Sequence, residues 1–169
     1  ASLIILLLFN FIMTPSFLSI TMKDGHLFGN TIDILNRAAP LILISLGMTL
    51  VIATQGIDIS VGSIIAISAA LSATVIVDGG SVPLAIAIGV VSGLICGIWN
   101  GFLVSYIGVQ PMVGTLILYI VGRGIAQLIT GGQILTFTNK DFIFIGTGYI
   151  LLPVAIFIAL AVALIMYFL

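Results

Sequence analysis

Charged residues are scarce in this sequence. Among its 169 residues, only four are Lys or Arg and five are Asp or Glu. Soluble domains carry roughly a quarter charged residues. The low charge, the 62% of hydrophobic residues and the mean hydropathy of +1.45 therefore indicate a membrane protein. A net charge of -1 offers no acidic or basic surplus that would suggest a nucleic-acid partner.

Residues that build metal sites and catalytic centres are equally rare. His26 is the only histidine and has no second histidine or cysteine nearby, so we predict no metal site. Cys96 is the only cysteine, which excludes an internal disulfide, and it reads as a small hydrophobic residue. No catalytic triad or carboxylate pair can be assembled. The residues therefore offer no candidate catalytic site.

Nucleotide-binding motifs are also missing. No Gly-x-x-x-x-Gly-Lys-[Ser/Thr] sequence occurs, so the chain cannot hold ATP in a P-loop. The Gly122-x-Gly124 pair is followed by Gln127 instead of a third glycine, and it lies in an apolar run. It therefore fails as a dinucleotide motif.

Long apolar runs dominate what is present. We expect them to be helices, because an isolated strand cannot satisfy its backbone in lipid. The sequence thus predicts an all-α, polytopic transmembrane bundle that occupies residues 1–169 as one domain. The first residue is not methionine and the last run is cut short, so we expect a fragment, and we predict no signal peptide. The predicted segments are 1–22, 38–55, 61–77, 82–107, 111–130 and 151–169.

The connections between these runs differ in character. Residues 23–37 mix charged and aliphatic side chains, which is typical of a short amphipathic helix at the membrane interface. Residues 78–81 and 108–111 predict tight turns. Residues 131–150 predict a longer loop.

The most informative feature is a polar sequence between two apolar runs, Gln55-Gly56-Ile57-Asp58-Ile59-Ser60-Val61-Gly62. The runs on either side are long enough to cross most of a bilayer core of ~30 Å. Glycines permit backbone conformations that a helix interior does not use, so the sequence predicts a helix break.

Two interpretations of this break are open, and they are compatible. Asp58 or Ser60 could cap the helix that begins near Val61 by accepting hydrogen bonds from its free amides. Alternatively, Gln55, Gly56, Asp58, Ser60 and Gly62 could line an aqueous route for a polar solute, as interrupted helices do in transporters.

Segment 82–107 carries a stripe of glycines spaced by four residues. Such spacing creates a groove in which another helix can approach closely, so we predict a helix–helix seam. Lining of a substrate route is the alternative. The stripe consists of Gly89, Gly93, Gly97 and Gly101.

Segment 111–130 carries a polar stripe with the same spacing, formed by Thr115, Tyr119, Arg123 and Gln127. An arginine at mid-span costs about 2.5–3.5 kcal/mol on insertion scales, so it needs a carboxylate, carbonyl groups or water. Arg123 could snorkel to the nearer interface, form a structural ion pair, or face a transport route together with the other residues of the stripe.

These motifs resemble the bacterial ABC sugar-importer permeases of the ribose, xylose and galactofuranose type. That family commonly reads G-M-T-L-V-I-x-T-x-G-I-D-L-S-V-G where this chain has residues 47–62. The departures are Gln55 in place of Gly or Ser, Ile59 in place of Leu, and the residues of 112–114. Further matches are Trp99-Asn100-Gly101, Val109-Gln110-Pro111, Gly122-Arg123-Gly124, and residues 128–137.

The resemblance implies an importer permease in the bacterial inner membrane, with about ten helices of which this chain supplies about six. It also implies several partners: a second permease subunit, cytoplasmic subunits that bind ATP and Mg²⁺, a periplasmic sugar-binding protein and membrane lipid. The expected solute is a monosaccharide such as a furanose. The resemblance further implies that the permease is not an enzyme and holds no cofactor of its own. The segment that contacts the ATPase would lie in the half that is absent here.

Two other functions fit the same residues. One is an ion-coupled secondary transporter of a small polar solute, because broken helices are common there as well. The other is an ABC permease for a nucleoside. A structural membrane subunit without a route of its own is a further alternative.

Overall fold

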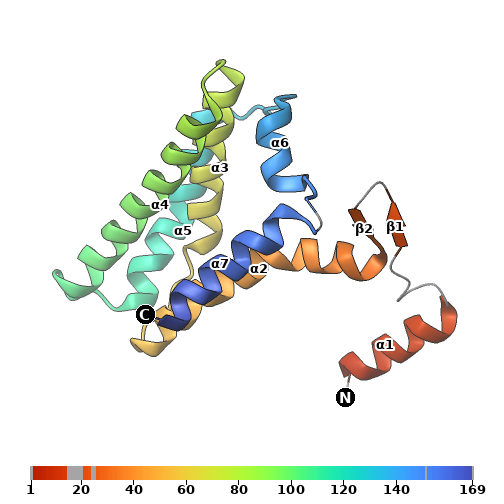
Figure 1. The fold of residues 1–169 in the computed structure, drawn as a ribbon. Coiled ribbons are helices and arrows are strands. Elements are labelled where there is room, and N and C mark those ends of the chain that lie inside the picture. Colours follow the sequence, from red (N-terminus) through yellow and green to blue (C-terminus); the bar gives the residue numbers. More distant parts are fainter. Residues whose placement is uncertain (1, 15–20, 24–25, 151, 169) are drawn as a thin grey trace. The chain divides into compact units, whose positions relative to one another are not determined.

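The computed structural model describes residues 2–14, 21–23, 26–150 and 152–168. Two compact units are distinguished, and each is treated separately below: Gly47–Asp141 form one, and Ala1–Leu46 together with Phe142–Leu169 form the other. Most described residues are helical, which confirms the predicted all-α class (Figure 1). Three helices are long and apolar enough to cross a membrane: α2 (Asn30–Ala53), α4 (Val82–Ser105) and α5 (Pro111–Thr130). Two apolar helices are shorter: α3 (Val61–Val77) and α7 (Val154–Phe168).

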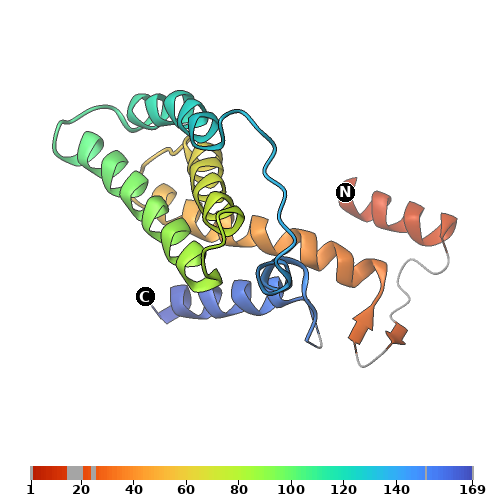
Figure 2. The same cartoon turned by 90° about the horizontal axis from the view of Figure 1, so that it is seen from above.

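The unit Gly47–Asp141 is built around α3, which packs against both α4 and α5. Figures 1 and 2 show α3 in yellow with green α4 and cyan α5 beside it. All three helices contribute buried residues, which include Ser63, Ile67 and Ala70 of α3, Ala85 of α4 and Leu118 of α5. The core of this unit therefore lies where α3 meets α4 and α5.

Proline and glycine explain where these helices begin and end. Pro111 occupies the first turn of α5, where its missing N–H is not needed, and Gly131 ends the helix with a left-handed φ of 62°. Between α3 and α4, Gly79 has a φ of 81° in the turn predicted at 78–81. The predicted turn before Pro111 contains Gly108 with a φ of 79°.

Two predictions for the connections are wrong. Residues 23–37 do not form a separate amphipathic helix. Strand β1 (Thr21–Lys23) pairs antiparallel with β2 (His26–Phe28), and α2 then runs from Asn30 into the apolar segment. Pro40 lies inside α2, a position that membrane helices tolerate. In the predicted loop 131–150, α6 spans Lys140–Thr147, and the side-chain Oδ1 of Asn139 caps its start by accepting a hydrogen bond from Asp141 N–H at 3.1 Å.

The other unit contains α1 (Ser2–Met13), the strand pair, most of α2 and α7. Of the predicted segment 1–22, helix α1 covers the part up to Met13, and residues 15–20 lie outside the described part of the chain. Ala39 of α2 and Ala159 of α7 are buried beside a small apolar pocket of about 170 Å³. The Tyr149 hydroxyl donates a hydrogen bond to Asp33 Oδ1 at 3.3 Å. Burial and the neighbouring Asp33 carboxylate both raise the pKa of Tyr149.

Candidate functional site

The candidate site is the helix break between α2 and α3. The last turn of α2 closes with two backbone hydrogen bonds: Gln55 N–H donates to Ile52 O, and Gly56 N–H donates to Val51 O, both at 2.9 Å. This pair of bonds is a Schellman motif, which requires a left-handed residue at the position that Gln55 occupies. Gln55 accordingly has a φ of 59°. Residues 56–60 then leave the helical conformation until α3 begins at Val61.

The glycines of the break do not play the part that the sequence predicted for them. Neither Gly56 nor Gly62 has a positive φ, and the left-handed residue is Gln55. Gly56 is needed for space, because a Cβ there would lie 3.1 Å from Val51 O. Gly62 lies in the first turn of α3, and a Cβ there would meet nothing within 4 Å.

Asp58 shapes the break through Ser60. Asp58 Oδ1 accepts hydrogen bonds from Ser60 N–H at 2.7 Å and from the Ser60 hydroxyl at 2.6 Å. The prediction that the Ser60 side chain caps α3 is wrong, because Ser60 makes no side-chain cap bond. Asp58 accepts from the amide of Ser60 itself, the residue directly before α3. The first turn is closed instead by the Ser60 carbonyl oxygen, which accepts from Ser63 N–H and Ile64 N–H. The Asp58 carboxylate thus fixes the position of Ser60, whose carbonyl oxygen accepts the first hydrogen bonds of α3.

Asn100 of α4 connects this turn to the next helix. Its Nδ2 donates to Ser60 Oγ at 2.8 Å, and Ser60 in turn donates to Asp58. Ser60 has no exposed surface and Asn100 is 7% exposed. The sequence analysis missed this role, although a lone asparagine near the end of an apolar helix was a signal for it.

Thr115 of α5 holds the backbone of the break from the other side. Its Oγ1 accepts a hydrogen bond from Ile59 N–H at 3.3 Å and lies 3.3 Å from Ile57 O. The shortest contact of Oγ1 is 2.9 Å to Pro111 O, one turn earlier in α5. The non-helical residues are thus held between α4 and α5.

A cavity of about 400 Å³ opens beside the break. It is lined by the end of α2, the break itself, α4 and the beginning of α5. Asn100 Oδ1 is buried and has no hydrogen-bond partner among the described residues. Leaving such an atom unpaired costs about 1–3 kcal/mol. The lining residues are Val51, Thr54, Gly56, Ile57, Asp58, Gly97, Asn100, Gly101, Val104, Ser105, Pro111 and Thr115.

The glycine stripe of α4 divides into two halves. A Cβ at Gly89 would lie 2.5 Å from Ser72 Oγ of α3, so this part of the stripe is in close helix contact. A Cβ at Gly93 would make ordinary contacts with α3 at 3.7 and 3.9 Å. At Gly97 and Gly101 a Cβ would meet nothing within 4 Å, and both glycines line the cavity.

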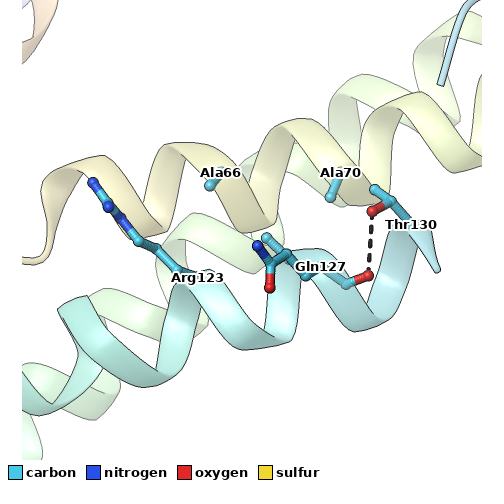
Figure 3. Close-up of a pocket in the computed structure, with 6 residues that line it drawn as sticks. Ala66, Ala70, Arg123, Gln127 and Thr130 are labelled. Atoms are coloured by element: carbon cyan, nitrogen blue, oxygen red, sulfur yellow. Dashed lines mark hydrogen bonds between the residues drawn. The ribbon is translucent and has the colours of Figure 1, made fainter. Parts of the chain in front are cut away.

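The polar stripe of α5 is also divided. Thr115 lies at the break, whereas Arg123 and Gln127 line a groove of about 370 Å³ together with Ala66 and Ala70 of α3 (Figure 3). The groove also includes Ala126 and Thr130.

Arg123 has an aromatic partner, and no carboxylate of the described residues pairs with it. Its guanidinium carbon lies 4.7 Å from the centre of the Tyr119 ring, one turn earlier in α5. Among the described residues Asp58 bonds to Ser60 alone, so the structure contains no ion pair between Asp58 and Arg123.

The fold and this site define a multi-pass helical membrane protein with an interrupted helix pair beside a cavity that Asp58, Asn100 and Thr115 help to line. Comparison with known proteins identifies the class. Residues 30–169 match the family described as branched-chain amino acid transport system / permease component. The chain belongs to this family.

Several curated relatives carry more specific names. The chain is 48% identical over 159 residues to a galactofuranose transporter permease protein of Escherichia coli K12, covering 94% of this chain and 47% of the relative. It is 44% identical to a fructose import permease protein of Bifidobacterium longum, covering 69% of the chain and 33% of the relative. It is 39% identical to a ribose import permease protein of Bacillus subtilis, covering 88% and 44%. The chain thus spans half or less of the length of these relatives. No solved structure is a significant match.

Proposed function

We propose that the full-length protein is the membrane-spanning permease subunit of an ATP-driven importer for a monosaccharide. The observation that carries this proposal is the 48% identity, across 94% of the chain, to a galactofuranose transporter permease protein. The fructose and ribose import permeases among the relatives support the solute class, since each of them is named for a monosaccharide. A furanose is the specific solute that the first of these similarities favours.

The chemistry of the break supports a neutral, hydroxylated solute. Amide, hydroxyl and backbone groups can each exchange one hydrogen bond with a sugar hydroxyl. In this proposal the break residues Gln55, Gly56, Asp58, Ser60 and Gly62 lie along the route and α5 presents Arg123 and Gln127 toward it. The permease itself catalyses no reaction.

The proposal also specifies the protein's setting. The subunit would lie in the bacterial inner membrane and pair with a second permease subunit. ATP and Mg²⁺ would bind to separate cytoplasmic subunits, and a periplasmic binding protein would deliver the sugar. Family membership supports these partners, and none of them would require a nucleotide site in this chain.

Uptake by a reconstituted system tests this function. The full-length permease, its ATPase and its binding protein would be placed in proteoliposomes and offered radiolabelled galactofuranose, fructose, ribose and a nucleoside. We expect uptake of a monosaccharide that requires ATP on the ATPase side. Uptake without ATP that follows an imposed ion gradient would instead identify a secondary transporter, and uptake of the nucleoside alone would reassign the solute.

A further inference from the structure

The cavity beside the break contains an acceptor that no group in the described part of the chain satisfies. Asn100 is 7% exposed and donates through Nδ2 to Ser60 Oγ, but its Oδ1 has no partner among the described residues. A buried carbonyl oxygen is normally hydrogen-bonded. Since Asn100 lines the cavity, the missing donor has room to approach from there.

The neighbouring groups define what kind of donor fits. Both hydrogen bonds to Asp58 end on Oδ1, so the other carboxylate oxygen takes no part in the contacts with Ser60. Gly97 and Gly101 leave open space at the cavity wall, since a Cβ on either would meet nothing within 4 Å. The site therefore combines two side-chain oxygen acceptors, from Asn100 and Asp58, with open space beside Gly97 and Gly101.

A metal ion is a poor match for these groups. The described residues contain no cluster of three or more His, Cys, Asp or Glu that could hold one. Asp58 is the only charged residue that lines the cavity. A volume of about 400 Å³ lies within the range of small-molecule pockets, roughly 300–1,000 Å³, and far exceeds the ~30 Å³ share of one water molecule.

We infer that this cavity binds a neutral hydroxyl group, which donates a hydrogen bond to Asn100 Oδ1. The hydroxyl belongs either to a sugar or to an ordered water molecule, since both offer the same O–H donor. The sugar version rests on the proposed function, because it places part of the transported solute here. In either version Asn100 is a binding residue that the sequence patterns did not reveal.

Thermal unfolding of the full-length permease in lipid nanodiscs tests the sugar source. A ligand that binds only the folded protein raises its unfolding temperature with concentration. Ribose, fructose and galactofuranose would be titrated against the wild type and two variants. Gly101→Val fills the cavity without a steric clash at Cβ. Gly124→Val is the matched control, because Gly124 also has nothing within 4 Å of its Cβ but does not line the cavity.

We expect one of these sugars to raise the unfolding temperature of the wild type and of Gly124→Val. In Gly101→Val the rise is lost. Asn100→Leu removes the acceptor at similar volume, and we expect the apparent affinity for the sugar to fall roughly tenfold or more. A sugar-dependent rise that is the same in Gly101→Val and in the wild type overturns the sugar version.

A high-resolution map of the sugar-free, full-length protein tests the water source. An ordered water within hydrogen-bond distance of Asn100 Oδ1, with no response to any sugar, supports the inference with water as the donor. The inference is overturned if Oδ1 faces only carbon atoms in that map and the sugars act equally on Gly101→Val.

Uptake assays keep this result separate from the proposed function. If Gly101→Val takes up sugar with ATP at the wild-type rate, the transported sugar does not need this cavity, and the importer assignment still stands. If the wild-type system takes up no sugar with ATP, the importer assignment is contradicted. The unfolding and map data still decide whether a hydroxyl binds at Asn100.

Discussion

Gln55 adopts a backbone conformation that suits glycine better than glutamine. Its φ of 59° places it in the left-handed region, where a residue with a Cβ loses about 1–2 kcal/mol. The side chain is exposed, so it gains little from packing in return. This is also the position at which the family commonly has Gly or Ser, so the departure from the family pattern coincides with a strained backbone.

We therefore expect Gln55→Gly to stabilise the full-length protein by about 1 kcal/mol. Thermal unfolding in detergent is the measurement, with Gln55→Ala as the control. Alanine keeps a Cβ and gains nothing from the left-handed conformation. A glycine variant that unfolds below the alanine variant would show that the turn does not need a left-handed residue.

Asp58 accepts two hydrogen bonds from Ser60. Substitutions at position 58 can show whether this acceptor oxygen, and not only the size of the side chain, stabilises the break. Asp58→Asn retains an oxygen that can accept from Ser60 N–H and the Ser60 hydroxyl. Asp58→Leu removes this acceptor from both donors, although Ser60 is fully buried. We expect Asp58→Leu to lose about 1–3 kcal/mol more than Asp58→Asn. The yield of monodisperse protein and its unfolding temperature measure this difference, and equal values for the two variants would remove the acceptor role.

At the scale of helices, α5 packs closely against α3 at Gly122. A Cβ there would lie 2.9 Å from Ser63 Cβ, and Ser63 is fully buried. Two residues further, Gly124 has no neighbour within 4 Å of the same position. The two glycines of one short motif thus have different structural roles.

Gly122→Ala should destabilise the helix pair by about 1–3 kcal/mol through overpacking. Gly124→Ala, on the same helix, should be neutral or stabilising, since alanine favours the helix over glycine by up to ~1 kcal/mol. Thermal unfolding of the two variants side by side checks the pair. Equal unfolding temperatures would mean that α3 and α5 do not meet at Gly122.

In the described part of the chain, Asp58, between α2 and α3, and Arg123 of α5 form no ion pair, so exchanging their charges should not restore a lost contact. If the break and the Arg123 groove are separate features, the double substitution Asp58→Arg and Arg123→Asp should recover neither the stability nor the uptake lost in the single variants. A double-mutant cycle measures their coupling. Recovery by the charge exchange would require the two side chains to meet in the membrane.

Helix positions could be predicted from the sequence wherever proline or glycine marks an end. The ranges 61–77 and 111–130 agree with α3 and α5. The start of α2 at Asn30 was missed because residues 30–37 mix charged, polar and aliphatic side chains and therefore resemble a connection, although they form the first turns of the same helix. Helix α6 was missed because it has only eight residues and its cap, Asn139, lies in a polar loop.

The candidate site could be predicted only in part. The polar residues at 55–62 pointed to the interruption because a carboxylate between two apolar runs has no packing explanation. The partnership of Asp58, Ser60 and Asn100 depends on residues 40 positions apart in the chain. Helical periodicity describes one helix at a time, so it cannot show which face of α4 meets the break.

For the whole molecule, the central claim is that the interrupted helix pair borders a water-accessible route. Three features of the break support that claim: the non-helical backbone between Gln55 and Val61, the Asp58 carboxylate at the cavity, and the space beside Gly97 and Gly101 of α4. Irregular backbone is tolerated at membrane depth only where protein buries it or where it lines a water-filled cavity.

Cysteine accessibility in the full-length protein tests this claim most directly. Gly101→Cys would be made in a cysteine-free background and exposed to a membrane-impermeant thiol reagent, with Ile98→Cys on the same helix, outside the cavity, as the control. We predict that the thiol at position 101 is labelled, that the transported sugar slows its labelling, and that the thiol at position 98 is unreactive. A thiol at position 101 that stays as unreactive as the one at 98, in the presence and absence of ATP, would contradict a water-accessible route beside the break.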